Sequence, residues 1–350
     1  MNLIARILLL ATGLTPTWAQ SPAMPAAAPP VETFRLSTGP CAAEGYPMTI
    51  QFGAFVRPDG KTMPVPAGHT LDGIWGLSNI GQVVGDEFQP VPERLEILYF
   101  SYLEDTFYEG NFALPHERLR ALLRTGFWHR RKQQQLTYEH LTVCVLPKGV
   151  VVVWLDGIGR QVLVGRYQGT RSDVDFRRFY PKSDRAAMLR QKLTAAPPAV
   201  RAQVQAGALT TRQWDAYLVQ YPWQVAFSQP LTLTSYQVNF LSGEYIAEPE
   251  TREMAPYLRA IRTPQARPVP SSLTFAVADE AGHKYTLRAS PLDEAETQAA
   301  FQQLHAAHPA APVTLLVETD KYVKAASFVL ESGGQRIPLT KSPVRITALN

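Results

Sequence analysis

The chain is predicted to adopt an α+β fold of two related halves, each an antiparallel sheet with one main helix. Two observations carry this prediction. Short segments in which apolar and polar residues alternate recur along the chain, as in half-buried strands. The same order of segments, a β-β-α-β-β-β unit, then occurs a second time at nearly constant spacing. A helical connector is expected to join the two halves.

The first copy of this unit begins with two strands, residues 95–100 and 106–112, joined by a tight turn at Glu104 and Asp105. Pro115 follows, and leucines at helical spacing after it predict a helix that this proline opens. Three further strands complete the copy, and their expected positions are residues 141–146, 150–155 and 160–167.

The second copy repeats these elements in the same order. Its helix is expected after Pro291, which lies 176 residues beyond Pro115. Its five strands are expected at residues 273–277, 283–289, 313–317, 324–330 and 336–339. A near-constant offset across six elements indicates an internal duplication, although any two α+β domains share some element order.

The beginning of the chain has the pattern of a secretory signal peptide. Residues 1–19 combine one positive charge at Arg6, a short apolar core and small residues before the expected cleavage site. Residues 20–44 are expected to be a flexible tether, residues 45–181 the first half, residues 182–222 the connector and residues 223–350 the second half. The expected location is the periplasm, with no transmembrane segment in the mature chain.

The only two cysteines, Cys41 and Cys144, belong to a chain that is expected in an oxidising compartment. An even count there favours a disulfide between them. Cys144 also lies in an apolar strand pattern, which suits a buried free thiol that packs as a small hydrophobic group. Both interpretations stay open.

Composition limits the classes of partner. The 350 residues contain 34 basic and 30 acidic side chains, so the net charge is +4. The longest basic run, residues 129–132, is typical of a solvated loop. Nucleic acid is therefore not an expected partner.

No catalytic constellation emerges from the motifs, and no cofactor or metal is expected. Residues 76–81 come near the Gly-x-Ser-x-Gly frame of a nucleophilic serine but miss it by one position. Glu104 and Asp105 allow a paired-carboxylate interpretation, yet their place in a hairpin turn favours a structural role. An exported hydrolase that uses these carboxylates remains an alternative.

Aromatic residues gather in the first half and suggest a protein-binding surface. Because side chains alternate between the two faces of a strand, some of the hairpin tyrosines are expected to reach solvent. The candidate interface comprises Trp75, Tyr99, Tyr102, Glu104, Asp105 and Tyr108. The loop at residues 68–86 is the second candidate docking element.

Several ordered motifs resemble those of a bacterial envelope family, the domain-of-unknown-function family two-nine-three-one. The resemblance covers roughly residues 45 to 340. The motifs are FSYLEDTFYEG at 100–110, GVVVVWL at 149–155, GRQV at 159–162, GRYQ at 165–168, DVD at 173–175, the Trp214 helix with YPW at 221–223, and Lys321-Tyr322.

Members of this family are mostly exported proteins and lipoproteins, and no activity is established for the family as a whole. This chain departs from many members because no lipid-attachment cysteine follows its apolar leader. The resemblance implies a periplasmic, non-enzymatic binding protein, with an immunity protein against a secreted lipase-type effector as the leading expectation. The hydrolase and a structural envelope protein are the alternatives.

Overall fold

The computed structural model describes residues 32–83, 85–247 and 252–349. The predicted signal peptide and the first part of the predicted tether lie outside these ranges. From Thr33 onward the tether prediction is wrong, because β1 (Thr33–Arg35) and β2 (Ser37–Ala42) occupy this segment. Leu36 and Cys41 are buried there. Burial of these apolar side chains ties the segment to the core.

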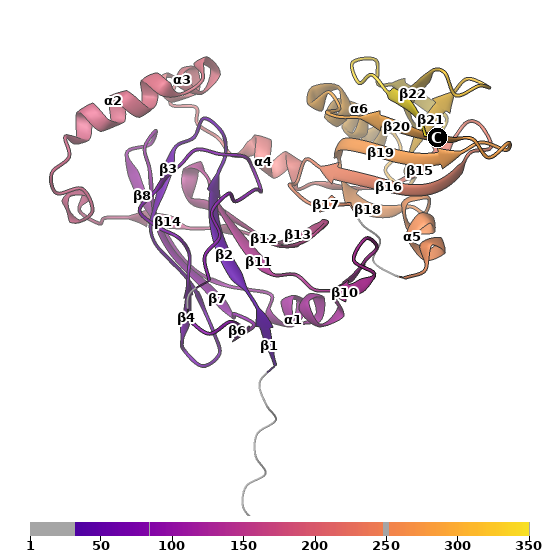
Figure 1. The fold of residues 1–350 in the computed structure, drawn as a ribbon. Coiled ribbons are helices and arrows are strands. Elements are labelled where there is room, and N and C mark those ends of the chain that lie inside the picture. Colours follow the sequence, from indigo (N-terminus) through magenta and orange to yellow (C-terminus); the bar gives the residue numbers. More distant parts are fainter. Residues whose placement is uncertain (1–31, 84, 248–251, 350) are drawn as a thin grey trace, which may run out of the picture. The chain divides into compact units, whose positions relative to one another are not determined.

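One antiparallel sheet of the first half carries the predicted hairpin (Figure 1). Its strands lie in the order β14-β8-β7-β3-β4, with β5 also paired to β3. Their bounds are β3 (Met48–Val56), β4 (Thr62–Pro64), β5 (Thr70–Leu71), β7 (Arg94–Ser101), β8 (Thr106–Ala113) and β14 (Thr170–Ser172). The hairpin β7–β8 pairs in one register along its whole length, which confirms its prediction.

A second sheet has nine strands and continues from the first half into the second. Its order is β2-β11-β12-β13-β17-β16-β19-β20-β24. The bounds beyond β2 are β11 (His140–Val145), β12 (Val150–Gly157), β13 (Arg160–Gln168), β16 (Thr232–Phe240), β17 (Tyr245–Ile246), β19 (Pro270–Ala278), β20 (Lys284–Ala289) and β24 (Arg345–Leu349). The short strand β17 pairs with both β13 and β16.

A five-stranded sheet completes the second half, in the order β18-β15-β21-β22-β23. Its bounds are β15 (Gln220–Phe227), β18 (Gln265–Pro268), β21 (Val313–Thr319), β22 (Ala326–Ser332) and β23 (Gln335–Pro338). Two small sheets pair β1 with β6 (Phe88–Pro90) and β9 (Phe127–His129) with β10 (Gln134–Leu136). The structure therefore has a mixed α+β fold with several sheets.

Both halves use one order of strand pairing. In the first half β2 runs parallel to β11, and β3 runs antiparallel to β7. In the second half β15 runs parallel to β21, and β16 runs antiparallel to β19. Two antiparallel neighbours then follow each parallel pair along the sheet, β12 and β13 in the first half and β22 and β23 in the second.

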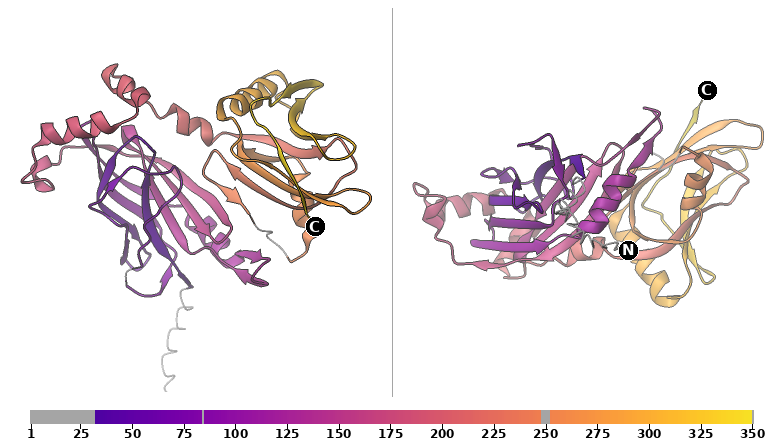
Figure 2. Two further views of the ribbon diagram at one scale, coloured as in Figure 1. Left: turned by 45° about the horizontal axis from the view of Figure 1, so that its top comes forward. Right: turned by 90° about the horizontal axis from the view of Figure 1, so that it is seen from below.

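The described helices other than α5 lie within the predicted units and connector, with small shifts at their ends, whereas α5 lies in a part of the second half where no helix was predicted (Figures 1 and 2). Their bounds are α1 (His116–Thr125), α2 (Arg185–Ala195), α3 (Pro198–Gln205), α4 (Arg212–Tyr217), α5 (Met254–Ile261) and α6 (Glu294–Ala307), with short 3-10 turns η1 (Pro147–Gly149) and η2 (Phe176–Arg178). Pro115 stands directly before α1, as predicted. The Asp184 carboxylate caps α2 by accepting from the backbone N–H of Ala187.

The connector ends earlier than predicted. Strand β15 begins at Gln220, inside the segment that was assigned to the connector. Trp223 of this strand is completely buried in the core of the second half. Burial of this large ring places the start of the second half before Pro222, because the strand that carries it must reach the core.

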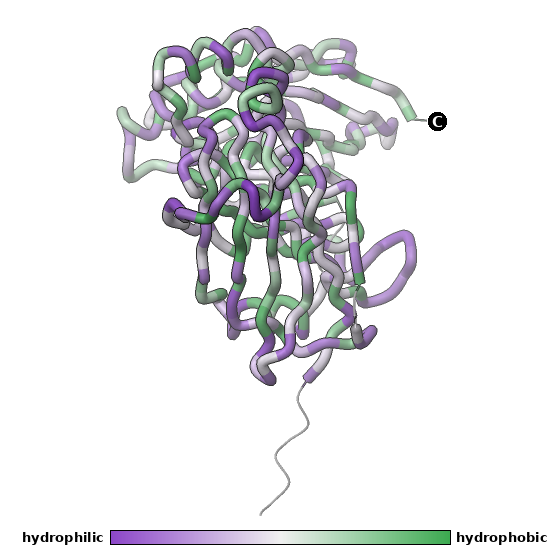
Figure 3. Tube along the Cα trace, turned by 90° about the vertical axis from the view of Figure 1, so that its left-hand side faces the viewer, coloured by the Kyte–Doolittle hydropathy of each residue, from purple (hydrophilic) through white to green (hydrophobic). Residues whose placement is uncertain are grey.

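Two main apolar cores fill the sheets, one in each half, and the first also takes in residues from the connector helices. Figure 3 shows hydrophobic residues along the strands and many hydrophilic residues at the loops between them. The Trp154 indole N–H donates to the Ser242 carbonyl at 3.0 Å, so a first-half core residue bonds to the loop before β17. No helix in the described ranges is long and apolar enough to cross a membrane.

Candidate functional site

The tyrosines of the predicted interface are core residues. Tyr99, Tyr102 and Tyr108 are all buried, so their assignment to an exposed interface is wrong. Tyr99 and Tyr108 belong to the first main core, while Tyr102 packs in a smaller aromatic cluster on the other side of the hairpin. Phe176 joins that cluster from η2, and Leu189 packs against it from α2. The aromatic side chains near the hairpin turn are therefore buried, because η2 and α2 pack over them.

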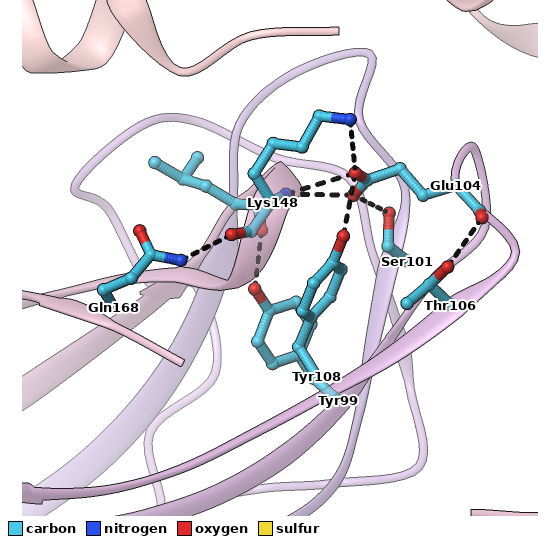
Figure 4. Close-up of polar contacts among 8 residues, drawn as sticks. Tyr99, Ser101, Glu104, Thr106, Tyr108, Lys148 and Gln168 are labelled. Carbon is cyan, nitrogen blue, oxygen red and sulfur yellow. Dashed lines mark hydrogen bonds and ion pairs between the residues drawn. The ribbon is translucent and has the colours of Figure 1, made fainter. Parts of the chain in front are cut away.

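Glu104 is a buried carboxylate that joins two turns (Figure 4). Its side chain is only 4% exposed. It accepts hydrogen bonds from the Ser101 hydroxyl at 2.9 Å, the Tyr108 hydroxyl at 3.0 Å and the Lys148 backbone N–H at 3.0 Å. The Lys148 ammonium lies 3.4 Å from the same carboxylate. Because Lys148 has a left-handed φ of 61°, these contacts stabilise a turn that an L-residue rarely adopts.

Glu104 and Asp105 make different contacts, unlike two carboxylates that act together on one substrate. Burial, followed by the negative charge of Glu104, raises the pKa of Tyr108 to about 12, so this hydroxyl donates as a neutral group. Asp105 instead points to the Arg185 guanidinium, 2.7 Å away, and is itself half-exposed. The two carboxylates thus contact different partners, Lys148 for Glu104 and Arg185 for Asp105.

The two cysteines lie directly opposite each other on the parallel strands β2 and β11. Both are buried free thiols in the structure. Burial, with a contact from Cys41, raises the pKa of the Cys144 thiol well above its ordinary value. The predicted disulfide is not formed here, but the register brings both thiols together and its formation stays a prediction.

A row of polar groups crosses the nine-stranded sheet beside these cysteines, and the sequence motifs did not reveal it. His140 Nδ1 lies 2.7 Å from the Ser37 hydroxyl, and burial lowers the pKa of this histidine. Burial raises the pKa of Asp156, on the neighbouring strand, to about 6, and the carboxylate accepts from the Thr142 hydroxyl at 3.0 Å. The register that pairs His140 with Asp156 across β11 and β12 produces this row.

Ser78 lies close to this row but is not poised as a nucleophile. Its hydroxyl contacts the carbonyl oxygens of Pro40 and Ile80, each at 2.8 Å. The described residues contain no hydrogen bond from Ser78 to His140, and none from His140 to Asp156. In the structure the Ser78 hydroxyl thus contacts backbone carbonyl groups rather than the histidine.

The segment that follows β5 and ends at the first residue of β6 exposes an unusual amount of apolar surface. Of the ten large hydrophobic side chains that are exposed in the described ranges, five lie between Ile74 and Phe88. We name these five side chains the apolar loop. They are Ile74 (57% exposed), Leu77 (46%), Ile80 (39%), Val83 (49%) and Phe88 (56%).

Trp75 anchors this loop while its neighbours remain in solvent. Its indole N–H donates to the Leu241 carbonyl at 2.9 Å. Its ring packs edge-on against Trp154, with ring centres 4.7 Å apart. The Gln161 side-chain amide also donates to the Gly76 carbonyl at 2.8 Å. Trp75 is thus partly buried against the core and supports the loop rather than forming its exposed surface.

The charge of the loop region is negative. No lysine or arginine occurs between Lys61 and Arg94, whereas Asp72, Asp86 and Glu87 do. Asp86 is paired with the Arg57 guanidinium at 3.6 Å and Glu87 with the Arg35 guanidinium at 3.6 Å, and both pairs moderate this charge. The region therefore offers a partner an apolar surface with an acidic border.

A groove of about 840 Å³ lies on the outer face of the six-stranded sheet. Its floor carries Leu98, Glu96 and Glu109, and its wall carries Arg178 and Phe179. The Ser172 hydroxyl donates to the Glu109 carboxylate at 2.9 Å.

No group of three potential metal-ligating side chains occurs in the part of the chain that the structure describes.

The fold and these surfaces define a mixed α+β protein that displays an apolar loop beside its sheets. A family model described as "Protein of unknown function (DUF2931)" matches residues 19–208, more than half of the chain, and the chain belongs to this family. No curated protein and no solved structure matches it. The match confirms the resemblance of the first-half motifs, while Trp214 and Lys321 lie beyond its end.

Proposed function

We propose that this chain is a non-enzymatic binding protein whose apolar loop docks a protein partner. The clustering of five exposed hydrophobic side chains between Ile74 and Phe88 carries the proposal. Exposed apolar side chains are ordinary when they are scattered but indicate an interaction site when they gather. Trp75 holds the loop against the core, so less conformational entropy is lost when a partner binds.

The size of the apolar loop suits a central contact of an interface. Full burial of one such side chain contributes about 1.5–3 kcal/mol, and these side chains are about half exposed. The five together therefore offer roughly 5 kcal/mol before the entropic cost of association is subtracted. This is enough for a hot-spot cluster, and further polar contacts around it would complete the interface.

We further propose that the protein acts in the periplasm as an immunity protein, with a secreted lipase-type effector as the partner. The secretory pattern of residues 1–19 and the family resemblance support this assignment. The exported-hydrolase alternative has less support, because Glu104 accepts hydrogen bonds that stabilise a turn and Asp105 forms an ion pair with Arg185. No observation favours a purely structural envelope role.

The two halves are proposed to descend from an internal duplication. The shared order of strand pairing, including one parallel pair at the corresponding place in each half, supports this origin. Such a pairing order is more specific than a shared order of elements along the chain. In this interpretation the apolar loop, between β5 and β6, is an addition to the first half.

The proposal is tested by binding to the effector that a neighbouring gene encodes, measured by isothermal titration calorimetry and by rescue of effector toxicity. Replacing Ile74 and Leu77 with serine is expected to weaken binding at least tenfold and to reduce rescue, because each loses about 1 kcal/mol of burial. Ile158 and Val219, similarly exposed but distant in sequence, provide the matched control when both are replaced with serine.

Unchanged binding and rescue by the Ile74 and Leu77 variant would refute the role of the loop. An equal loss with the Ile158 and Val219 variant would also count against it, because the effect would then reflect general hydrophobicity. Failure of the wild-type chain to bind or protect against any neighbouring effector would reject the immunity assignment.

A further inference from the structure

The positive charge of the chain is concentrated in one segment. Residues 170–212 contain nine basic and three acidic side chains, a net charge of +6, whereas the whole chain carries only +4. Seven of the nine are arginines. We name this segment the basic arm, and its cations are Arg171, Arg177, Arg178, Lys182, Arg185, Arg190, Lys192, Arg201 and Arg212.

The basic arm begins at β14, the edge strand of the sheet that carries the hairpin, and continues outside the sheets through η2, α2 and α3 (Figures 1 and 2). None of the residues of α2 is buried. Its apolar side chains Met188 and Leu189 pack against the aromatic cluster, and Leu193 packs against the first core. Arg190 of the same helix is exposed.

Some cations of the arm are used within the protein. Arg185 pairs with Asp105 at 2.7 Å, and the Arg201 guanidinium donates to the Thr194 carbonyl at 3.2 Å. The Lys192 ammonium lies over the Tyr102 ring, 5.2 Å from its centre. The contacts of Arg185 and Lys192 hold the arm on the first half, whereas that of Arg201 lies within the arm.

Four other cations make no ion pair, although the Arg178 guanidinium lies over the Phe179 ring, 5.7 Å from its centre. Arg177, Arg178, Lys182 and Arg190 are exposed, and no carboxylate of the described residues lies within ion-pair distance of any of them. The Asp175 carboxylate, the nearest acidic group in sequence, accepts from the Arg177 backbone N–H. Positive charge that is not neutralised internally attracts an anionic partner.

The arm lacks the apolar surface of a protein interface. None of the ten exposed large hydrophobic side chains in the described ranges belongs to residues 170–212. Protein interfaces usually have an apolar centre that is depleted of charge, so this composition suits a charged surface better. Arginine binds phosphate oxygens through paired N–H donors, which a lipid headgroup supplies in a dense array.

We propose that the basic arm binds the phosphate headgroups of anionic phospholipids and so holds the protein at a membrane surface. Clusters of four to eight basic residues produce this type of attachment, and each contributes about a fivefold increase in affinity. The proposal does not rest on the binding of a partner at the apolar loop, because that loop is a different surface with negative charge. It also needs neither a lipid-attachment cysteine nor a spanning helix.

The test is sedimentation of the purified chain with vesicles of phosphatidylcholine alone and of phosphatidylcholine mixed with phosphatidylglycerol. The wild-type chain is expected to bind only the mixed vesicles and to dissociate as salt is added. Replacing Arg177, Arg178, Lys182 and Arg190 with glutamine is expected to weaken binding by roughly 600-fold, at about fivefold for each residue.

The matched control removes the same number and types of charge from the second half. It replaces Arg262, Lys284, Arg288 and Arg345 with glutamine, all exposed in the structure. This variant is expected to bind vesicles within about threefold of wild type, because residues distant from the surface act through screened interactions. Equal losses in the two variants would overturn the proposal.

Two further outcomes would also overturn it. If the wild-type chain bound mixed and neutral vesicles equally, headgroup charge would not be the recognised feature. If it bound duplex DNA or poly-glutamate at moderate salt but not the mixed vesicles, the arm would recognise another polyanion. Circular dichroism of all variants checks that each is folded.

Discussion

Asp156 provides a test of the polar row through the pH dependence of stability. This half-buried carboxyl lies near the end of β12, and burial raises its pKa from 3.8 to about 6. The native state therefore binds a proton more tightly than the unfolded chain does between about pH 4 and pH 6. The contribution of Asp156 to the free energy of unfolding falls as the pH rises through this window.

The magnitude follows from the size of the shift. A shift of about two pH units corresponds to about 3 kcal/mol at 1.4 kcal/mol per unit, and partial exposure reduces this to about 2 kcal/mol. In Asp156→Asn the side chain has nearly the same shape, still accepts from Thr142 and cannot ionise. The variant is expected to be about 2 kcal/mol more stable than wild type at pH 7.5 and equal to it at pH 4.

The assay is urea unfolding followed by tryptophan fluorescence at several pH values from 4 to 7.5. Burial also lowers the pKa of His140, so this histidine affects stability below about pH 6.5. Because His140 is present in both wild type and Asp156→Asn, its effect largely cancels in the difference between their free energies of unfolding. Asp320→Asn is the control of opposite sign. Backbone N–H donors from Ala325 and Lys324 lower the pKa of Asp320, so its replacement is expected to lower stability at neutral pH.

A difference between wild type and Asp156→Asn that does not vary with pH would refute this reasoning. Lower stability of the variant at pH 7.5 would do so as well, because it would mean that the ionised carboxylate is stabilising in the native state.

Two other predictions concern the first half. Glu104→Ala is expected to lower the free energy of unfolding by about 3 kcal/mol in a urea titration, because buried donors lose their acceptor. Asp105→Ala breaks only an exposed ion pair with Arg185, so it is expected to lower the free energy of unfolding by less than about 1 kcal/mol. Equal effects of the two substitutions would contradict this distinction. Cys41 and Cys144 are expected to form a disulfide in the exported protein. Reduction is then expected to add the mass of two hydrogens to the intact protein and to lower its free energy of unfolding by about 2–4 kcal/mol. A mass that does not change on reduction would show that both residues remain thiols.

The elements of both units were predictable because they depend on local pattern. The hairpin β7–β8, the start of α1 after Pro115 and the strands β11 to β13 follow alternation, helical spacing and turn residues. The error over β1 and β2 has a physical cause. These strands are short and gain their stability from the edge of a sheet and from pairing with β11, which composition does not express.

The candidate interface was predictable only in part. The alternation of apolar and polar residues indicates that the two faces of the hairpin differ in polarity. It does not indicate which elements cover each face, so Tyr102 was wrongly expected among the tyrosines that reach solvent. Exposure of Ile74 and Phe88 was equally invisible, because their residue types are those of a core. Charge clustering in residues 170–212 was present in the sequence, yet the net charge of the whole chain concealed it.

The sequence by itself determined the α+β class and the family, because these depend on periodicity and on ordered motifs. Only the tertiary structure decided that Glu104 is buried while Asp105 is exposed, since adjacent residues of one turn face different neighbours. It also decided that β17 continues one sheet between the halves and that the apolar loop stays outside the core. These outcomes depend on contacts between residues far apart in the chain, which no local pattern specifies.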